Sequence, residues 1–140
     1  MAMWDPSTPF GQRIEAKLNS ALIIWLVTSD GDGTPQPSPV WFLREGETLL
    51  IYSKPNAPKV RNIAARPQVA LHFDTNADGS DVIIFHGTAA VDTNAPPPDQ
   101  PGPYLEKYRA EIAGIQMTTD EFAATYSTPI RVRLEKVRGF

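Results

Sequence analysis

At 140 residues the chain is long enough for one compact domain with a single core and too short for two, so we expect one domain over residues 1–140. The formal net charge of −3 gives no basic excess for following a phosphate backbone, which argues against nucleic acid as a partner. The absence of cysteine excludes disulfides, thiolate metal sites and cysteine nucleophiles. No apolar run approaches the roughly 20 residues that span a bilayer, so we expect a cytoplasmic protein without a membrane partner.

The first half of the chain predicts a short helix and then a three-stranded meander. The helix begins at Pro9, where Ser7 or Thr8 caps it, and ends near Asn19. The strands are apolar runs bounded by glycine turns, and they cover residues 21–28, 36–43 and 48–53. In the second strand, Pro37 and Pro39 each remove a ladder donor, which predicts a weakly paired or bulged segment.

The second half alternates short helices with further strands. Asn56 is expected to cap a helix that Pro67 closes, and Thr119 is expected to cap a later one. Alternating or apolar patterns predict strands over residues 69–73, 81–91 and 129–137, and helices over 104–115 and 119–126. A proline-rich loop is expected over residues 94–103. Six hairpin-linked strands with short flanking helices predict an α+β, mainly β fold in which a six-stranded antiparallel sheet closes into a small barrel.

Motifs for ordinary side-chain catalysis are absent from the sequence. There is no GxSxG, Walker A, HExxH or EF-hand pattern. His72 and His86 lie in different predicted strands and, without cysteine, form no convincing metal site. We therefore predict neither a catalytic side chain nor a bound metal.

A cluster of polar and basic residues marks the end of the third strand and the start of the helix that follows. Cations at a helix N-terminus oppose the helix dipole, whereas a bound anion there meets free amides, the dipole and the cations together. This arrangement predicts a phosphate site, with a solvated basic helix face as the alternative. Helical geometry favours Lys59 and Asn62 as ligands over Arg61, which reaches the site only by its length. The cluster comprises Tyr52, Ser53, Lys54, Lys59, Arg61 and Asn62.

The proline-interrupted strand places unpaired backbone groups beside a large aromatic ring. Backbone hydrogen bonds at a ring edge and an apolar wall are what a flat heteroaromatic ligand needs. The alternative is a bulge at a barrel rim. The residues in question are Ser38, Pro39, Val40 and Trp41.

These segments, taken in order, resemble the pyridoxamine phosphate oxidase-like split barrels that bind flavins. The matching stretches are Pro35-Gln36-Pro37-Ser38-Pro39-Val40-Trp41, Leu50-Ile51-Tyr52-Ser53, Lys59-Val60-Arg61-Asn62-Ile63 and Arg66-Pro67. The sequence is most similar to the small deazaflavin branch, the coenzyme F420-dependent oxidoreductases, and the similarity covers residues 8–92 and 129–140.

The resemblance implies a homodimer with two cofactor clefts at the subunit interface. Ser53, Lys54, Lys59 and Asn62 would hold the cofactor phosphate, and residues 38–41 would line the ring. The partner's strand around residues 82–86 would close the cleft. The chain ends at Phe140 without the Arg-x-His substrate pair of the true pyridoxamine phosphate oxidases, which argues against vitamin metabolism.

The expected function is therefore an oxidoreductase that uses coenzyme F420 to transfer a hydride to a small organic substrate. FMN in the same barrel is the alternative cofactor, and a non-catalytic cofactor carrier is the alternative class of protein. We expect F420 to be preferred, since Pro37 and Pro39 leave only Ser38, Val40 and later residues to donate to a ring edge. FMN has a nitrogen acceptor at the central ring position where F420 has a carbon, so a site without a donor there leaves FMN unpaired and costs F420 nothing.

Overall fold

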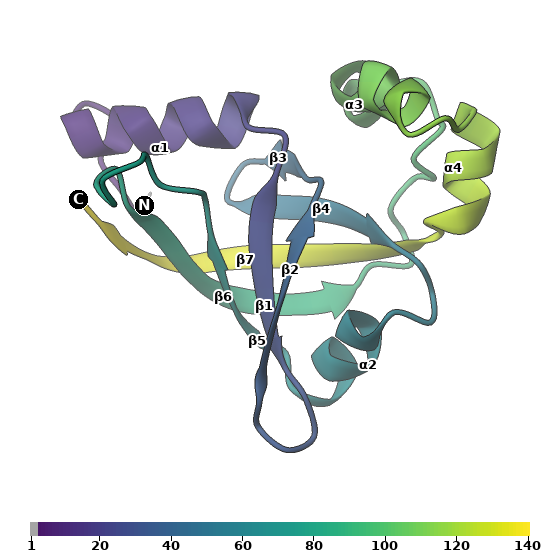
Figure 1. Cartoon of the computed structure of the whole chain (residues 1–140), viewed down its shortest axis with the longest axis horizontal. Coiled ribbons are helices and arrows are strands. Elements are labelled where there is room, and N and C mark those ends of the chain that lie inside the picture. Colours follow the sequence, from purple (N-terminus) through teal and green to yellow (C-terminus); the bar gives the residue numbers. More distant parts are fainter. Residues whose placement is uncertain (1–2) are drawn as a thin grey trace.

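The computed structural model describes residues 3–140 and consists of a curled antiparallel sheet with four short helices (Figure 1). The strand order is β2-β1-β5-β6-β7-β4-β3, a half-barrel whose two edge strands do not pair with each other. The strands are β1 (Ile24–Ser29), β2 (Pro35–Val40), β3 (Leu43–Glu45), β4 (Thr48–Ser53), β5 (Gln68–His72), β6 (Ile83–Val91) and β7 (Thr128–Gly139). The helices are α1 (Pro9–Ser20), α2 (Pro58–Ala65), α3 (Pro103–Gly114) and α4 (Thr119–Thr125).

The predicted α+β split-barrel class is confirmed, but the sheet has seven strands where six were expected. The expected strand over residues 36–43 divides into β2 and β3 at Trp41 and Phe42. There the Phe42 amide donates to the hydroxyl of Tyr108 in α3 at 2.8 Å instead of to a neighbouring strand. A side chain from a distant helix therefore interrupts a run that looks continuous in the sequence.

The weak or bulged pairing expected for the proline-rich strand is wrong. β2 pairs with β1 along its whole length, from Ser29↔Pro35 to Ile24↔Val40. β2 is an edge strand, and prolines at alternate positions of an edge strand can all turn their nitrogens away from the neighbour. The ladder is therefore intact despite three prolines in six residues.

The predicted cap is correct in α1, is one residue off in α4 and is wrong in α2. Thr8 caps α1 by accepting the Gly11 amide at 3.0 Å, as predicted. Asn56 is not the cap of α2: the N-cap is Ala57, which has no side-chain hydrogen bond to offer. α4 is capped by Thr118, one residue before the expected Thr119, in a capping box.

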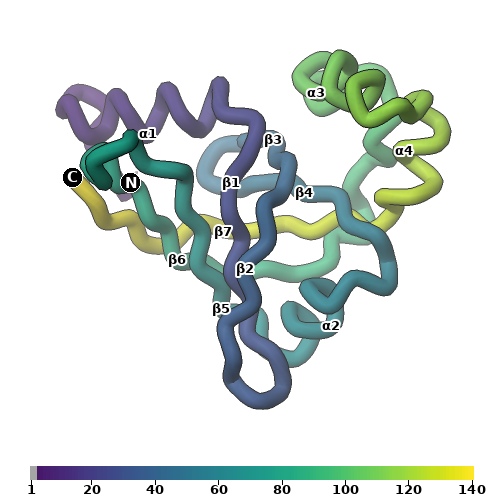
Figure 2. Tube along the Cα trace, viewed as in Figure 1, coloured from purple at the N-terminus to yellow at the C-terminus, as the bar shows by residue number. Residues whose placement is uncertain are grey.

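Two groups of buried side chains hold the elements together. The first, which we name the sheet core, lies between the sheet and α1 and includes Ile14, Leu18, Leu26 and Val132. The second lies where α3 and α4 meet β4, near the opposite end of the half-barrel from α1 (Figure 2). This second group, the aromatic cluster, comprises Leu50, Tyr52, Tyr104, Leu105, Tyr108, Ile112 and Phe122, with Trp41 and Tyr126 packed against it. None of the helices described here is long and apolar enough to cross a membrane.

Candidate cofactor site

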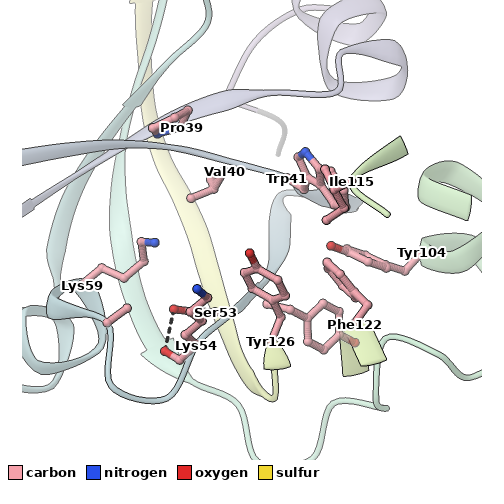
Figure 3. A pocket seen from close by; sticks show the side chains of 12 residues that line it. Pro39, Val40, Trp41, Ser53, Lys54, Lys59, Tyr104, Ile115, Phe122 and Tyr126 are labelled. Carbon is pink, nitrogen blue, oxygen red and sulfur yellow. Dashed lines mark hydrogen bonds between the residues drawn. The ribbon is translucent and has the colours of Figure 1, made fainter. Parts of the chain in front are cut away.

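A cavity of about 410 Å³ opens where the ends of β2 and β4, the start of α2 and the α3–α4 pair meet (Figure 3). This volume is within the range of small-molecule sites in proteins, about 300–1,000 Å³. The lining residues are Pro39, Val40, Trp41, Tyr52, Ser53, Lys54, Ala57, Lys59, Tyr104, Ile115, Phe122 and Tyr126.

Seven of the ten residues singled out in the sequence meet on this wall. They come from two segments that the sheet brings together, and they are Pro39, Val40, Trp41, Tyr52, Ser53, Lys54 and Lys59. Ser38, Arg61 and Asn62 are not on the wall. Asn62 is buried and donates through Nδ2 to Thr28 Oγ1 at 3.0 Å, so it holds α2 against β1. Arg61 is exposed and donates to the Asn56 carbonyl at 3.2 Å.

One end of the cavity is cationic. Lys54 and Lys59 are its charged lining residues, and no Asp, Glu or His lines it (Figure 3). Burial lowers the pKa of Lys59, because the partly buried ammonium has lost water and gained no carboxylate. The first turn of α2 contains no acidic residue, so the positive end of the helix dipole is also uncompensated. This end of the cavity is suited to an anion such as phosphate.

The hydroxyl of Ser53, the last residue of β4, also lies at the polar end of the cavity. It donates to the Lys54 carbonyl at 3.0 Å, so it can bind a phosphate oxygen only by turning its single hydrogen away from that carbonyl. The Lys54 ammonium lies 5.7 Å from the centre of the Tyr126 ring, within cation–π range. Tyr126 therefore joins the cationic end to the aromatic end.

The other end of the cavity is aromatic, and most of it was missed in the sequence. Tyr104 and Phe122 lie in α3 and α4, and Ile115 and Tyr126 directly follow these two helices. The signal available was a spacing of four residues between Tyr104 and Tyr108 and again between Phe122 and Tyr126, which places each pair on one helix face.

Several of the rings at this end are stacked on one another. Trp41 stacks on Tyr108 with centroids 4.8 Å apart and planes 8° apart, and on Phe122 at 5.5 Å and 18°. Phe122 in turn stacks on Tyr126 at 4.7 Å. Trp41 and Tyr126 are only half-buried, so part of each ring is exposed on the cavity wall. Flat apolar faces of this kind suit a planar heteroaromatic ring.

Buried tyrosine hydroxyls fix this wall to the rest of the fold. The Tyr108 hydroxyl accepts the Phe42 amide and lies 2.8 Å from the Leu22 carbonyl, to which it donates. Tyr52 donates to the Pro96 carbonyl, and burial raises the pKa of Tyr52 to about 12. Both phenols stay neutral at physiological pH, so their hydroxyls can keep these hydrogen bonds to the backbone.

The donor set fits a phosphate-bearing flavin or deazaflavin. Ammonium groups and a helix N-terminus suit the phosphate, and the stacked rings suit the tricyclic system. In the part of the chain that the structure describes, no cluster of three or more His, Asp or Glu residues is arranged to hold a metal. His72 stacks on Trp25 at 6.2 Å, and neither histidine lines the cavity.

Residues 10–139 match the family model described as pyridoxamine 5'-phosphate oxidase. The chain belongs to this family. The pyridoxamine 5'-phosphate oxidase family binds flavins and includes oxidoreductases, and the match spans both segments that carry the predicted cofactor residues. No curated protein matches the chain.

Several solved structures share the fold. An F420 reductase is 25% identical, with a TM-score of 0.63, and the match covers 89% of this chain and 94% of that one. A conserved hypothetical protein of Mycobacterium tuberculosis is 17% identical, with a TM-score of 0.70 and coverage of 99% and 88%. The heme storage protein HutZ of Vibrio cholerae is 14% identical, with a TM-score of 0.66 and coverage of 94% and 95%. The last two similarities show the fold alone.

Proposed function

We propose that this member of the pyridoxamine 5'-phosphate oxidase family is an F420-dependent oxidoreductase that transfers a hydride between the deazaflavin and a small organic substrate. The observation that carries the proposal is one cavity with a cationic end at Lys54 and Lys59, a stacked aromatic end, and no acidic lining residue. The similarity to an F420 reductase over 89% of the chain supports the choice of cofactor.

Each end of the cavity has a distinct task in this proposal. Lys59, Lys54 and Ser53 bind the phosphate, with the N-terminus of α2 adding its dipole. Pro39, Val40 and Trp41 pack against the ring system and orient it. When bound, the deazaflavin supplies the hydride chemistry, which explains why the wall needs no His or carboxylate for that step. The aromatic residues of α3 and α4 keep water away from the ring and shape the space left for substrate.

FMN is the second candidate cofactor, favoured by the family's flavin binding. Both cofactors carry a phosphate and a tricyclic ring, so the same residues would hold either one. A carrier protein would bind the cofactor equally well and differ only in turnover.

A spectroscopic titration separates these possibilities. Purified protein is titrated with F420 and with FMN, and reduced F420 is then mixed with quinone and enone acceptors while its oxidation is followed. We expect F420 to bind more tightly and to be oxidised in a protein-dependent manner. Tighter binding of FMN would identify FMN as the cofactor in place of F420. Binding of F420 without turnover would indicate a carrier protein, and binding of neither cofactor would refute the proposal.

We further propose that the protein is a homodimer. Alternate residues of β1, β5 and β6 are half-buried on the face away from the sheet core. On this face His72 of β5 lies between Trp25 of β1 and Ile84 of β6, and Val27 lies beside Ala70. A row of partly exposed apolar side chains on a sheet face is typical of a protein interface. Light scattering should give twice the chain mass of 15.4 kDa, and a stable monomer at micromolar concentration would exclude a shared cofactor cleft.

A further inference from the structure

The outer edge of β2 has an unusual hydrogen-bonding character. The Asp30 amide donates to the Thr34 carbonyl at 3.0 Å, so these two residues form a hydrogen-bonded pair next to the β1–β2 turn. In an antiparallel ladder such pairs recur at every second residue. The amides that face β1 are therefore those of Gln36, Ser38 and Val40, paired with Thr28, Leu26 and Ile24.

The remaining positions of β2 face outward, and all three are prolines. Proline has a carbonyl but no amide hydrogen, so the edge from Pro35 to Pro39 accepts hydrogen bonds and donates none. The amides of Ser38 and Val40, expected from the sequence to be available to a ligand, are used by the ladder with β1. Of the three prolines, only Pro39 lines the cavity, whereas Pro35 lies at the far end of the strand opposite Ser29.

A cavity edge without a donor at position 39 treats the two candidate cofactors differently. FMN has a nitrogen acceptor at the central position of its ring system, and the deazaflavin has a carbon that needs no hydrogen bond. A buried acceptor without a donor is destabilising, whereas a carbon in the same place loses nothing. Selectivity of this kind arises by leaving the unwanted ligand unsatisfied.

We infer that Pro39 is a specificity-determining residue that favours the deazaflavin, because it removes a backbone donor from the cavity edge. This inference rests on the proposed function and adds the residue that sets cofactor choice. It concerns the backbone nitrogen of residue 39, which faces away from β1. The binding of phosphate by Lys59 is a separate interaction and is expected to be the same with either cofactor.

The test restores the missing donor at one position and compares it with a matched position on the same edge. Pro39→Ala adds an amide beside the cavity, and Pro35→Ala adds one far from it. Both variants remove one proline from the same edge, so general effects on strand rigidity are shared. Dissociation constants for F420 and FMN are measured by equilibrium titration with each protein, after circular dichroism has confirmed folding.

We expect the preference for F420 over FMN to fall about ten- to hundredfold in Pro39→Ala and to stay at the wild-type value in Pro35→Ala. In an NMR titration, the new amide at position 39 should shift on addition of FMN. An unchanged preference in folded Pro39→Ala, or an equal change in both variants, would overturn the inference while leaving the F420 site in place. Wild-type protein that prefers FMN would also overturn it, and binding of neither cofactor would refute the proposed function itself.

Discussion

The sheet core and the aromatic cluster pack against the same sheet, yet they differ in composition and in exposure. The sheet core is rich in aliphatic residues such as Ile14, Leu26 and Val132, which are completely buried. The aromatic cluster holds a stack of rings at Trp41, Phe122 and Tyr126, and Trp41 and Tyr126 remain half-exposed on the cavity wall. Flexible aliphatic side chains fill space on all sides, whereas flat rings held in parallel leave a face for a further planar group.

This difference separates stability from binding. The sheet core should determine whether the chain folds, and the aromatic cluster should determine what the folded chain holds. Substitutions in the two regions are therefore expected to affect different measurements.

The largest expected effect is on folding, from truncation in the sheet core. Leu26→Ala removes a fully buried side chain from β1 and should lower the free energy of unfolding by about 2–5 kcal/mol, measured by urea denaturation. Leu22, just before the same strand, is 40% exposed, so Leu22→Ala should change the free energy by no more than about 0.5 kcal/mol. Equal effects of the two substitutions would contradict the assignment of the core.

A smaller loss is expected where the aromatic cluster is tied to the sheet. Tyr108→Phe leaves the Phe42 amide and the Leu22 carbonyl without their buried partner, which should cost about 1–3 kcal/mol in urea denaturation. Tyr104→Phe is the control, since Tyr104 is also buried but its hydroxyl makes no hydrogen bond within the described residues. If both variants unfold at the same urea concentration, the Tyr108 hydroxyl does not contribute to the stability of the fold.

A third expected effect is a pH dependence from Lys107 in α3. Its ammonium donates to the Phe42 carbonyl at 2.7 Å, and burial lowers the pKa of Lys107 to about 8 from the usual 10.5. Between pH 8 and 10 the unfolded chain therefore binds more protons than the folded chain. The contribution of Lys107 to the free energy of unfolding therefore increases as the pH is raised from 8 to 10 and decreases as the pH is lowered from 10 to 8. Urea denaturation of Lys107→Met across this range should show a flatter profile than the wild type. Superimposable profiles would place Lys107 in contact with water.

Much of the fold follows from local patterns in the sequence. The alternation of apolar and charged residues in β7 and the capped start of α1 at Pro9 both predict the observed elements. The division of β2 from β3 is not predictable in this way, because its cause is a hydroxyl 66 residues further along the chain, that of Tyr108. Local periodicity contains no information on a contact at that distance.

The candidate site shows the same limit. Spacing along α2 places Lys59 and Asn62 on one flank of the helix, which is correct as helical geometry. The angle at which α2 packs on β1 decides which of them reaches the cavity, and it turns Asn62 towards Thr28 and Lys59 towards the cavity. Likewise, the aromatic wall depends on α3 and α4 folding back over β4, a tertiary contact that residue spacing alone does not fix.

The most direct test of the central claim compares two basic residues two positions apart in α2. Lys59 lines the cavity with a pKa lowered by burial, whereas Arg61 is exposed and lies off the wall. Dissociation constants for F420 are measured by fluorescence titration for the wild type, Lys59→Ala and Arg61→Ala. A charge-assisted hydrogen bond contributes about 1.5–3 kcal/mol, so Lys59→Ala should bind about ten- to hundredfold more weakly while Arg61→Ala binds like the wild type. Unchanged affinity in a folded Lys59→Ala variant, or an equal loss in Arg61→Ala, would contradict the account.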